Sequence, residues 1–206
     1  MSVDALQVAI KAVIRASEII LETFGNPEGI EYKSRVDVVT DTDKRCEEEI
    51  VKILRSETPD FGIIAEEGTN FPGEKVWIVD PLDGTKEFIE GVSHFVVSIA
   101  LVESGQPTIG VLYNPVTGET STAAQDEGAC LNGEPIRCAT KENVSEMVIL
   151  NSRSETRQGL WEPYAGTFGE LRAIGSVAYK LGLTAVGQAD IFASLRPKNE
   201  WDICAG

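Results

Sequence analysis

The sequence lacks long hydrophobic runs, and this absence excludes one class of protein at once. No stretch reaches the roughly 18 consecutive apolar residues that a membrane-spanning helix needs. The N-terminal residues 1–20 carry polar side chains throughout, unlike the apolar region of a signal peptide. We therefore expect a cytoplasmic protein without a membrane partner. A chain of 206 residues that is 42% hydrophobic and 25% charged is typical of a globular protein with a real core.

Histidine and closely spaced cysteines are also scarce. The chain has one histidine, His94, and four cysteines, Cys46, Cys130, Cys138 and Cys204, with no C-x-x-C pair. Neither a zinc site nor a disulfide framework is therefore expected, and we predict that the cysteines are buried, reduced thiols. His94 opens a predicted strand, and we assign it no catalytic role.

Basic residues are too few for a protein that binds polymeric nucleic acid. Lys and Arg number 18 against 33 Asp and Glu, which gives a formal net charge of -15. Broad contact with nucleic acid phosphates depends on clustered Lys and Arg, so this partner class is excluded. Metal cations, and small anions that such cations bring with them, are the natural ligands.

Hydrophobic periodicity predicts a layered α/β protein. Apolar residues recur at helical spacing over residues 5–24, and a second helix with acidic residues in its N-terminal half is predicted over 40–58. Buried strands are predicted over 62–65 and 76–80, with a turn directly after the second, and an antiparallel meander follows over 94–114. The first helix is expected to cover this sheet.

The pattern changes from about residue 147, where strands and helices begin to alternate. We therefore predict an N-terminal α+β domain over residues 1–145, which carries the acidic motifs, and a partial C-terminal α/β domain over residues 146–206. The acidic run Glu47, Glu48 and Glu49 is interpreted as a solvated face of the second helix.

Carboxylates stand at the ends of several predicted elements. Glu66 and Glu67 follow one strand, Asp80 and Asp83 follow the next, and Asp202 lies in the last predicted helix. If the strands are neighbours, their carboxyl ends bring these acids into one crevice. Two carboxylates about 4 Å apart repel by about 4 kcal/mol at an effective dielectric of about 20, so a cation is expected among them. Oxygen ligands favour Mg²⁺, although Asp-Pro-Leu-Asp-Gly alone is also typical of a simple turn.

An anion site is predicted beside these acids. Gly84 and Thr85 occupy the N-terminus of a predicted helix, where backbone N–H groups face a ligand. The hydroxyl of Thr85 is positioned to share a water with a further acid, for which Asp43 is the candidate. Asp43 is explained equally well as an acid that stabilises the start of its own helix.

Four motifs together resemble a known family. DVVTDTD, IIAEEG, WIVDPLDGTKEF and NEWDICAG, spread over residues 37–206, resemble in order the signatures of the inositol monophosphatase superfamily. Its members are Mg²⁺-dependent, often lithium-sensitive phosphomonoesterases. The resemblance implies a layered αβαβα sandwich of the inositol monophosphatase and fructose-1,6-bisphosphatase type. Family members usually continue past the last motif, so this chain is expected to lack the C-terminal portion of that fold.

The resemblance also implies roles for individual residues. Asp43 and Thr85 would hold and deprotonate the attacking water, and Glu67 would orient a further water. Two or three Mg²⁺ ions would be held by Glu66, Asp80, the carbonyl of Leu82, Asp83 and Asp202. Substrate would be bound by Gly84, Thr85, Gly175 and Ser176. Lys33, which precedes the first motif, is a candidate for contact with a substrate phosphate, and it is also explained as a solvated side chain.

Fewer residues indicate which substrate class of the superfamily the chain resembles. DPLDGTKEFI with Lys86 and Glu87, AIGSVAYK with Lys180, and PKNEWD look closer to the 3'(2'),5'-bisphosphate nucleotidases than to inositol monophosphatases. This similarity favours hydrolysis of adenosine 3',5'-bisphosphate to AMP and phosphate, with inositol-1-monophosphatase as the alternative. Arg196, Lys198 and Asn199 are candidates for the mouth of the substrate site, although a loop with surface cations explains the same residues equally well.

Two other functions stay open at this point. The chain is also compatible with a non-catalytic protein that binds metal or a small phosphorylated metabolite, and with an acidic domain whose carboxylates only end helices and strands. The resemblance is compatible with a homodimer, but no residue of the sequence identifies an interface.

Overall fold

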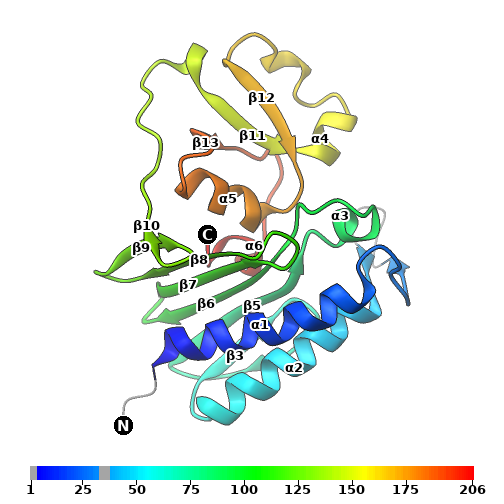
Figure 1. Cartoon of the computed structure of the whole chain (residues 1–206), viewed down its shortest axis with the longest axis vertical. Helices are drawn as coiled ribbons and strands as arrows, with labels where there is room; N and C mark the ends of the chain where they lie inside the picture. The colour runs from blue at the N-terminus through cyan, green and yellow to red at the C-terminus, as the bar shows by residue number, and fades with distance from the viewer. Residues whose placement is uncertain (1–3, 33–37) are drawn as a thin grey trace.

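Two long amphipathic helices form an outer layer of the molecule. The computed structural model describes residues 4–32 and 38–206. In it, α1 (Ala5–Thr23) and α2 (Asp41–Glu57) pack against each other and lie across one face of a large sheet (Figure 1). Each helix turns its apolar stripe toward that sheet, as helical spacing of apolar residues requires. Both predicted helices are confirmed, and so is the predicted position of the first helix over a sheet.

The large sheet contains eight strands in the order β10-β9-β8-β7-β6-β5-β3-β4. Within this sheet only β3 and β5 are parallel neighbours. Their carboxyl ends therefore lie side by side, as the clustering of the acids requires. The remaining neighbours are antiparallel and include the predicted meander. The strands are β3 (Gly62–Ala65), β4 (Asn70–Phe71), β5 (Lys75–Asp83), β6 (Val96–Glu103), β7 (Gln106–Asn114), β8 (Glu119–Ala124), β9 (Gly128–Leu131) and β10 (Glu134–Pro135).

The predicted turn after Asp80 is wrong, because β5 continues through it to Asp83. Proline has no N–H to donate to a ladder, and Pro81 accordingly lies where the register against β6 shifts, between Asp80 and Asp83. The Asp80 carboxylate accepts the Leu82 N–H in this irregular stretch, at 3.0 Å. The helix α3 (Thr85–Ile89) then begins after Gly84.

A second, smaller sheet lies above the first, with α5 between the two (Figure 1). Its strand β11 pairs in parallel with both β12 and β13, which confirms the alternation of strands and helices predicted from residue 147. A boundary near residue 145 stays a prediction. The elements here are β11 (Val148–Ser152), α4 (Arg153–Arg157), β12 (Glu170–Ile174), α5 (Val177–Ala185), β13 (Ile191–Phe192) and α6 (Glu200–Ile203).

The main apolar core lies between the long helices and the large sheet. It includes the fully buried side chains of Ile50, Trp77 and Phe88. The prediction that the cysteines are buried is correct only for Cys46, since Cys138 is exposed and the other two are half-buried; all four thiols are free. No helix in the described ranges is long and apolar enough to cross a membrane.

Candidate active site

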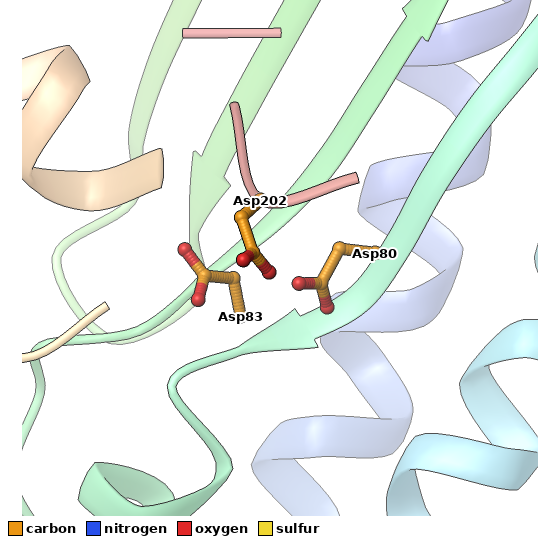
Figure 2. A group of neighbouring side chains, drawn as sticks. All are labelled: Asp80, Asp83 and Asp202. Atoms are coloured by element: carbon orange, nitrogen blue, oxygen red, sulfur yellow. The ribbon is translucent and has the colours of Figure 1, made fainter. Parts of the chain in front are cut away.

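Three aspartates meet at the carboxyl end of β5. Figure 2 shows the carboxylates of Asp80 and Asp202 turned toward each other and Asp83 beside them, with Asp80 and Asp83 on the irregular end of the strand and Asp202 on α6. One ligand oxygen from each lies within 4.8 Å of the others. Glu66, directly after β3, interacts with Asp80 and lines the same cleft as Asp83 and Asp202. We call these four residues the acidic floor.

The electrostatics of the acidic floor favour a bound cation. Burial raises the pKa of Asp80 well above its usual range, and the carboxylates of Glu66 and Asp83 raise it further. Burial also raises the pKa of Asp83, although hydrogen bonds from Ser176 and the Ala178 amide oppose that rise. Carboxylates this close repel one another by several kcal/mol unless a cation lies between them. The donors are all carboxylate oxygens, so they fit Mg²⁺.

Asp43 and Thr85 form a hydrogen-bonded pair at the cleft. The fully buried Asp43 carboxylate accepts the backbone N–H of Thr40 with one oxygen, at 2.8 Å, and the hydroxyl of Thr85 with the other, at 2.9 Å. The same carboxylate therefore caps α2 and reaches Thr85, so its contacts are compatible with both explanations of Asp43, and its catalytic role stays a prediction. Burial raises the pKa of Asp43, and the hydrogen bonds from Thr40 and Thr85 oppose the rise. Leu82, whose side chain is buried, has its carbonyl 3.2 Å from the Thr85 hydroxyl.

Two glycines let other elements approach the acidic floor. Gly84 has φ of 110°, and a Cβ there would lie 2.8 Å from the His94 carbonyl oxygen. A Cβ on Gly175 would overlap the side chain of Glu87. Next to it, Ser176 donates its hydroxyl to Asp83 at 2.6 Å and so ties the start of α5 to the acidic floor. Gly84, Thr85, Gly175 and Ser176, all predicted to bind substrate, line the cleft.

Basic side chains line the same cleft, which encloses about 220 Å³. Arg153, Lys180 and Lys198 are called the basic wall here. Lys180 is 2% exposed, donates to the Ile174 carbonyl at 3.1 Å, and has its pKa lowered to about 8 by burial. The Arg153 guanidinium donates to Glu87 at 3.0 Å and to Glu90 at 2.6 Å.

Sequence reasoning found part of the basic wall. Lys198 lines the cleft as expected, whereas Arg196 donates to Gln158 and Asn199 caps α6. Arg153 was missed, and so was its pairing with Glu87, since the two residues are 66 positions apart and no local pattern joins them. Lys33, predicted to meet the substrate, lies outside the described residues.

Glu67 lines a different recess from that lined by Glu66. It lines a neighbouring recess with Lys44, Glu47, Glu48 and Gly68, and it is not part of the group formed by the three aspartates. The interpretation of Glu47 as part of a solvated helix face is wrong. Its side chain is turned inward, the residue is 5% exposed, and its carboxylate accepts two backbone N–H groups from the loop that follows β3.

Comparisons with known proteins agree with the geometry. A model described as the inositol monophosphatase family matches residues 3–206. The chain is 36% identical over 215 residues to inositol monophosphatase 3 of Solanum lycopersicum, which covers 98% of this chain and 80% of that protein. It is 33% identical over 212 residues to the fructose-1,6-bisphosphatase/inositol-1-monophosphatase of Thermotoga maritima, covering 98% and 80%. A solved IMPase structure from Thermotoga maritima superposes with a TM-score of 0.91 at 33% identity, covering 98% of this chain and 80% of that one.

Proposed function

The chain belongs to the inositol monophosphatase family of phosphatases, and we propose that it hydrolyses a small phosphomonoester at the acidic floor with the help of Mg²⁺. One observation carries the proposal. Asp83 and Asp202, two of the three converging aspartates, line a cleft with Thr85, and the hydroxyl of Thr85 is already bonded to the buried carboxylate of Asp43. The cleft therefore offers a cation site and a route for a proton side by side.

The residues of the acidic floor would hold the ions. Glu66, Asp80, Asp83 and Asp202 offer carboxylate oxygens, and Leu82 offers a backbone carbonyl. When bound, Mg²⁺ supplies positive charge that neutralises phosphate oxygens and lowers the pKa of water. The number of ions, two or three, stays a prediction. The N–H groups at Gly84 and Thr85 would hold a phosphate oxygen in the same cleft.

Asp43 and Thr85 would move the proton of the attacking water. The Thr85 hydroxyl donates to Asp43, so an oxygen lone pair of Thr85 is available to a water in the cleft. That water would pass a proton to Thr85 as Thr85 passes its own to Asp43, and the water oxygen would attack phosphorus as the bond to the leaving oxygen breaks. The leaving oxygen would keep the electron pair of that bond and take a proton from a solvent water, which gives the alcohol product. The raised pKa of Asp43 suits a group that accepts a proton. Glu67, which lies in the neighbouring recess, would act on a further water.

The substrate is proposed from the names of relatives and from the cleft. Relatives include an inositol monophosphatase and a fructose-1,6-bisphosphatase/inositol-1-monophosphatase. These names support a phosphorylated polyol such as inositol 1-phosphate as the first candidate. The motif similarity to 3'(2'),5'-bisphosphate nucleotidases supports a second candidate, adenosine 3',5'-bisphosphate. The basic wall favours this second candidate, because its cations suit a substrate with another anionic group.

Phosphate release tests the proposal directly. The purified chain is incubated with inositol 1-phosphate, fructose 1,6-bisphosphate or adenosine 3',5'-bisphosphate, each with Mg²⁺ and with excess chelator. We expect Mg²⁺-dependent release from at least one substrate, and the ratio of kcat/KM values identifies the branch. A folded protein that binds Mg²⁺ but releases phosphate from none of them would contradict the proposal and support a non-catalytic binding protein.

Three features of the family resemblance stay predictions. Lithium is expected to inhibit the reaction, which a dose series in the same assay checks. A homodimer is expected, which sedimentation velocity checks. A cytoplasmic location is expected, which cell fractionation checks.

A further inference from the structure

Glu47 is a buried carboxylate that the proposed chemistry does not use. It lies on α2 four residues after Asp43, so the two side chains share one face of the helix. Asp43 reaches Thr85, and Glu47 reaches the loop between β3 and β4, which carries Glu66 and Glu67. One helix face therefore contacts both the proton route and a loop of the acidic floor.

Both oxygens of Glu47 are engaged by that loop. One accepts the N–H of Glu67 at 2.7 Å, and the other accepts the N–H of Thr69 at 3.0 Å. The loop is closed on itself as well, since the Ala65 N–H donates to the Thr69 carbonyl at 2.9 Å. A carboxylate is suited to this task because it accepts from two donors and offers no hydrogen that would face them.

These bonds fix the backbone on the C-terminal side of Glu66. The Glu66 N–H donates to the Val79 carbonyl of β5 at 3.2 Å, and the next N–H in the chain is the one held by Glu47. The peptide groups on both sides of Glu66 are thus anchored, one to the strand that carries Asp80 and the other to α2. These two anchors set the position from which the Glu66 side chain, which interacts with Asp80, faces the acidic floor.

We propose that Glu47 is a positioning residue that presents Glu66 to the metal site by holding the Glu67 and Thr69 amides. The proposal rests on the proposed metal-binding function of the acidic floor. Residues that orient metal ligands without touching the metal typically contribute about 10- to 100-fold in metal affinity. A glutamine at position 47 keeps the shape of the side chain but turns an NH₂ group toward an N–H donor, so one of the two bonds is lost.

The test compares Glu47→Gln with Glu48→Gln as a matched control. Glu48 is the next residue of α2, is exposed, and lines the same recess, so its neutralisation removes the same charge without touching the loop amides. Mg²⁺ binding to each metal-stripped protein is measured by titration calorimetry, and thermal unfolding is measured in chelator. We expect Glu47→Gln to weaken Mg²⁺ binding by about 10- to 100-fold, and Glu48→Gln to change it by less than about 3-fold.

The kcat value of Glu47→Gln distinguishes a positioning role of Glu47 from a catalytic role. At saturating Mg²⁺ the kcat of Glu47→Gln is expected to return to within about 3-fold of the wild-type value, because the Asp43 and Thr85 pair is untouched. Unchanged Mg²⁺ affinity in a folded Glu47→Gln protein would overturn the proposal, as would equal losses in both variants. Glu47→Asp, which keeps the charge on a shorter side chain, is the second variant if Glu47→Gln does not fold. If neither folds, Glu47 is a stability residue and the proposal is wrong.

The Mg²⁺ affinity of Glu47→Gln tests the positioning role without any knowledge of the substrate. Wild-type protein that binds Mg²⁺ but hydrolyses nothing would contradict the proposed function and leave the positioning of Glu66 intact. Weakened binding in Glu47→Gln with active wild-type protein supports both. Unweakened binding with active wild-type protein contradicts the positioning role alone.

Discussion

The large sheet and the small sheet hold their parts of the cleft by different means. The large sheet and its two long helices share an extensive apolar core, and Asp80 and Asp83 extend from that core on a central strand. The small sheet has a much smaller apolar cluster around Leu150, Ile174 and Ala189. Its contribution to the cleft is fixed mainly by polar contacts.

Glu155 illustrates the polar support in the small sheet. Its buried carboxylate accepts the Trp161 indole N–H at 2.9 Å, the Ser194 hydroxyl at 3.0 Å and the Leu195 N–H at 3.2 Å. These bonds hold the segment that leads from β13 to Lys198. The large sheet therefore presents Asp80 and Asp83 on an apolar scaffold, whereas the small sheet presents its part of the cleft on a scaffold of directional bonds, which single substitutions can retune. The following predictions test this division.

The largest expected effect is on the proposed proton transfer through Thr85 to Asp43. Asp43→Asn is expected to lower kcat by about 10²- to 10⁴-fold, the usual contribution of a positioned acid or base. The Mg²⁺ affinity should change little, because Asp43 is not one of the three clustered aspartates. Steady-state kinetics and titration calorimetry provide the two measurements. Asp41→Asn, an exposed acid in the same first turn of α2, is the control. Equal losses in both variants would show that the charge of the helix start, and not the bond to Thr85, matters.

The apolar scaffold should respond most in stability. Ile50→Ala removes a fully buried side chain from the main core and is expected to lower the free energy of unfolding by about 2–5 kcal/mol. Leu21→Ala, at a residue that is 50% exposed on α1, should change it by less than about 0.5 kcal/mol. Urea unfolding measures both values. A cost for Ile50→Ala as small as that for Leu21→Ala would mean that this core does not carry the scaffold.

The basic wall should respond in KM. Arg153→Gln is expected to raise KM by about 10- to 100-fold, the loss that follows when one hydrogen bond to a charged group is removed. The kcat value should stay within about 3-fold if the residue binds substrate equally in the ground and transition states. Arg157→Gln is the control, because Arg157 also binds Glu90 but does not line the cleft. If kcat falls instead of KM rising, Arg153 acts in chemistry and the division between the two scaffolds fails.

Sequence reasoning succeeded where local patterns carry the structure. Asp80 and Asp83 follow an apolar strand with a proline between them, and Asp43 stands at a recognisable helix start, so their places follow from chain-local rules. Asp202 was grouped with them as a further acid at the end of an element, and the motif resemblance supported that grouping. The extension of β5 through Pro81 was not foreseen, because a bulge and a turn use the same residue types.

The sequence alone does not predict which side chains are buried when their burial depends on how the layers pack. Glu47, Glu48 and Glu49 are identical letters in a row, yet only Glu47 is buried, because the loop after β3 supplies two N–H donors to it. Arg153 of α4 meets Glu87 of α3 across 66 positions of the chain. Such pairings join elements that are distant in the chain, and helical or strand periodicity contains no information about them.

The smallest expected effect concerns an exposed ion pair between the two scaffolds. Arg157 and Arg153 lower the pKa of Glu90 to about 2, from an ordinary value of 4.5. A carboxylate with a depressed pKa in the folded state stabilises the protein above the unfolded pKa and loses that contribution as the pH falls toward the folded pKa. The melting temperature of wild-type protein should therefore exceed that of Glu90→Gln at pH 6, and the gap should close between about pH 4.5 and pH 2.

A change of salt concentration provides the control for this difference in melting temperature between wild-type protein and Glu90→Gln. The Glu90 side chain is 38% exposed and that of Arg157 is 59% exposed, so the pair is screened by solvent and its contribution is small. At pH 6 the gap in melting temperature should shrink when salt is raised to about 1 M, where the screening length falls to about 3 Å. A gap that persists unchanged at pH 2 and in high salt would mean that Glu90 stabilises the contact between α3 and α4 by packing, and the two scaffolds would then be joined by an apolar contact after all.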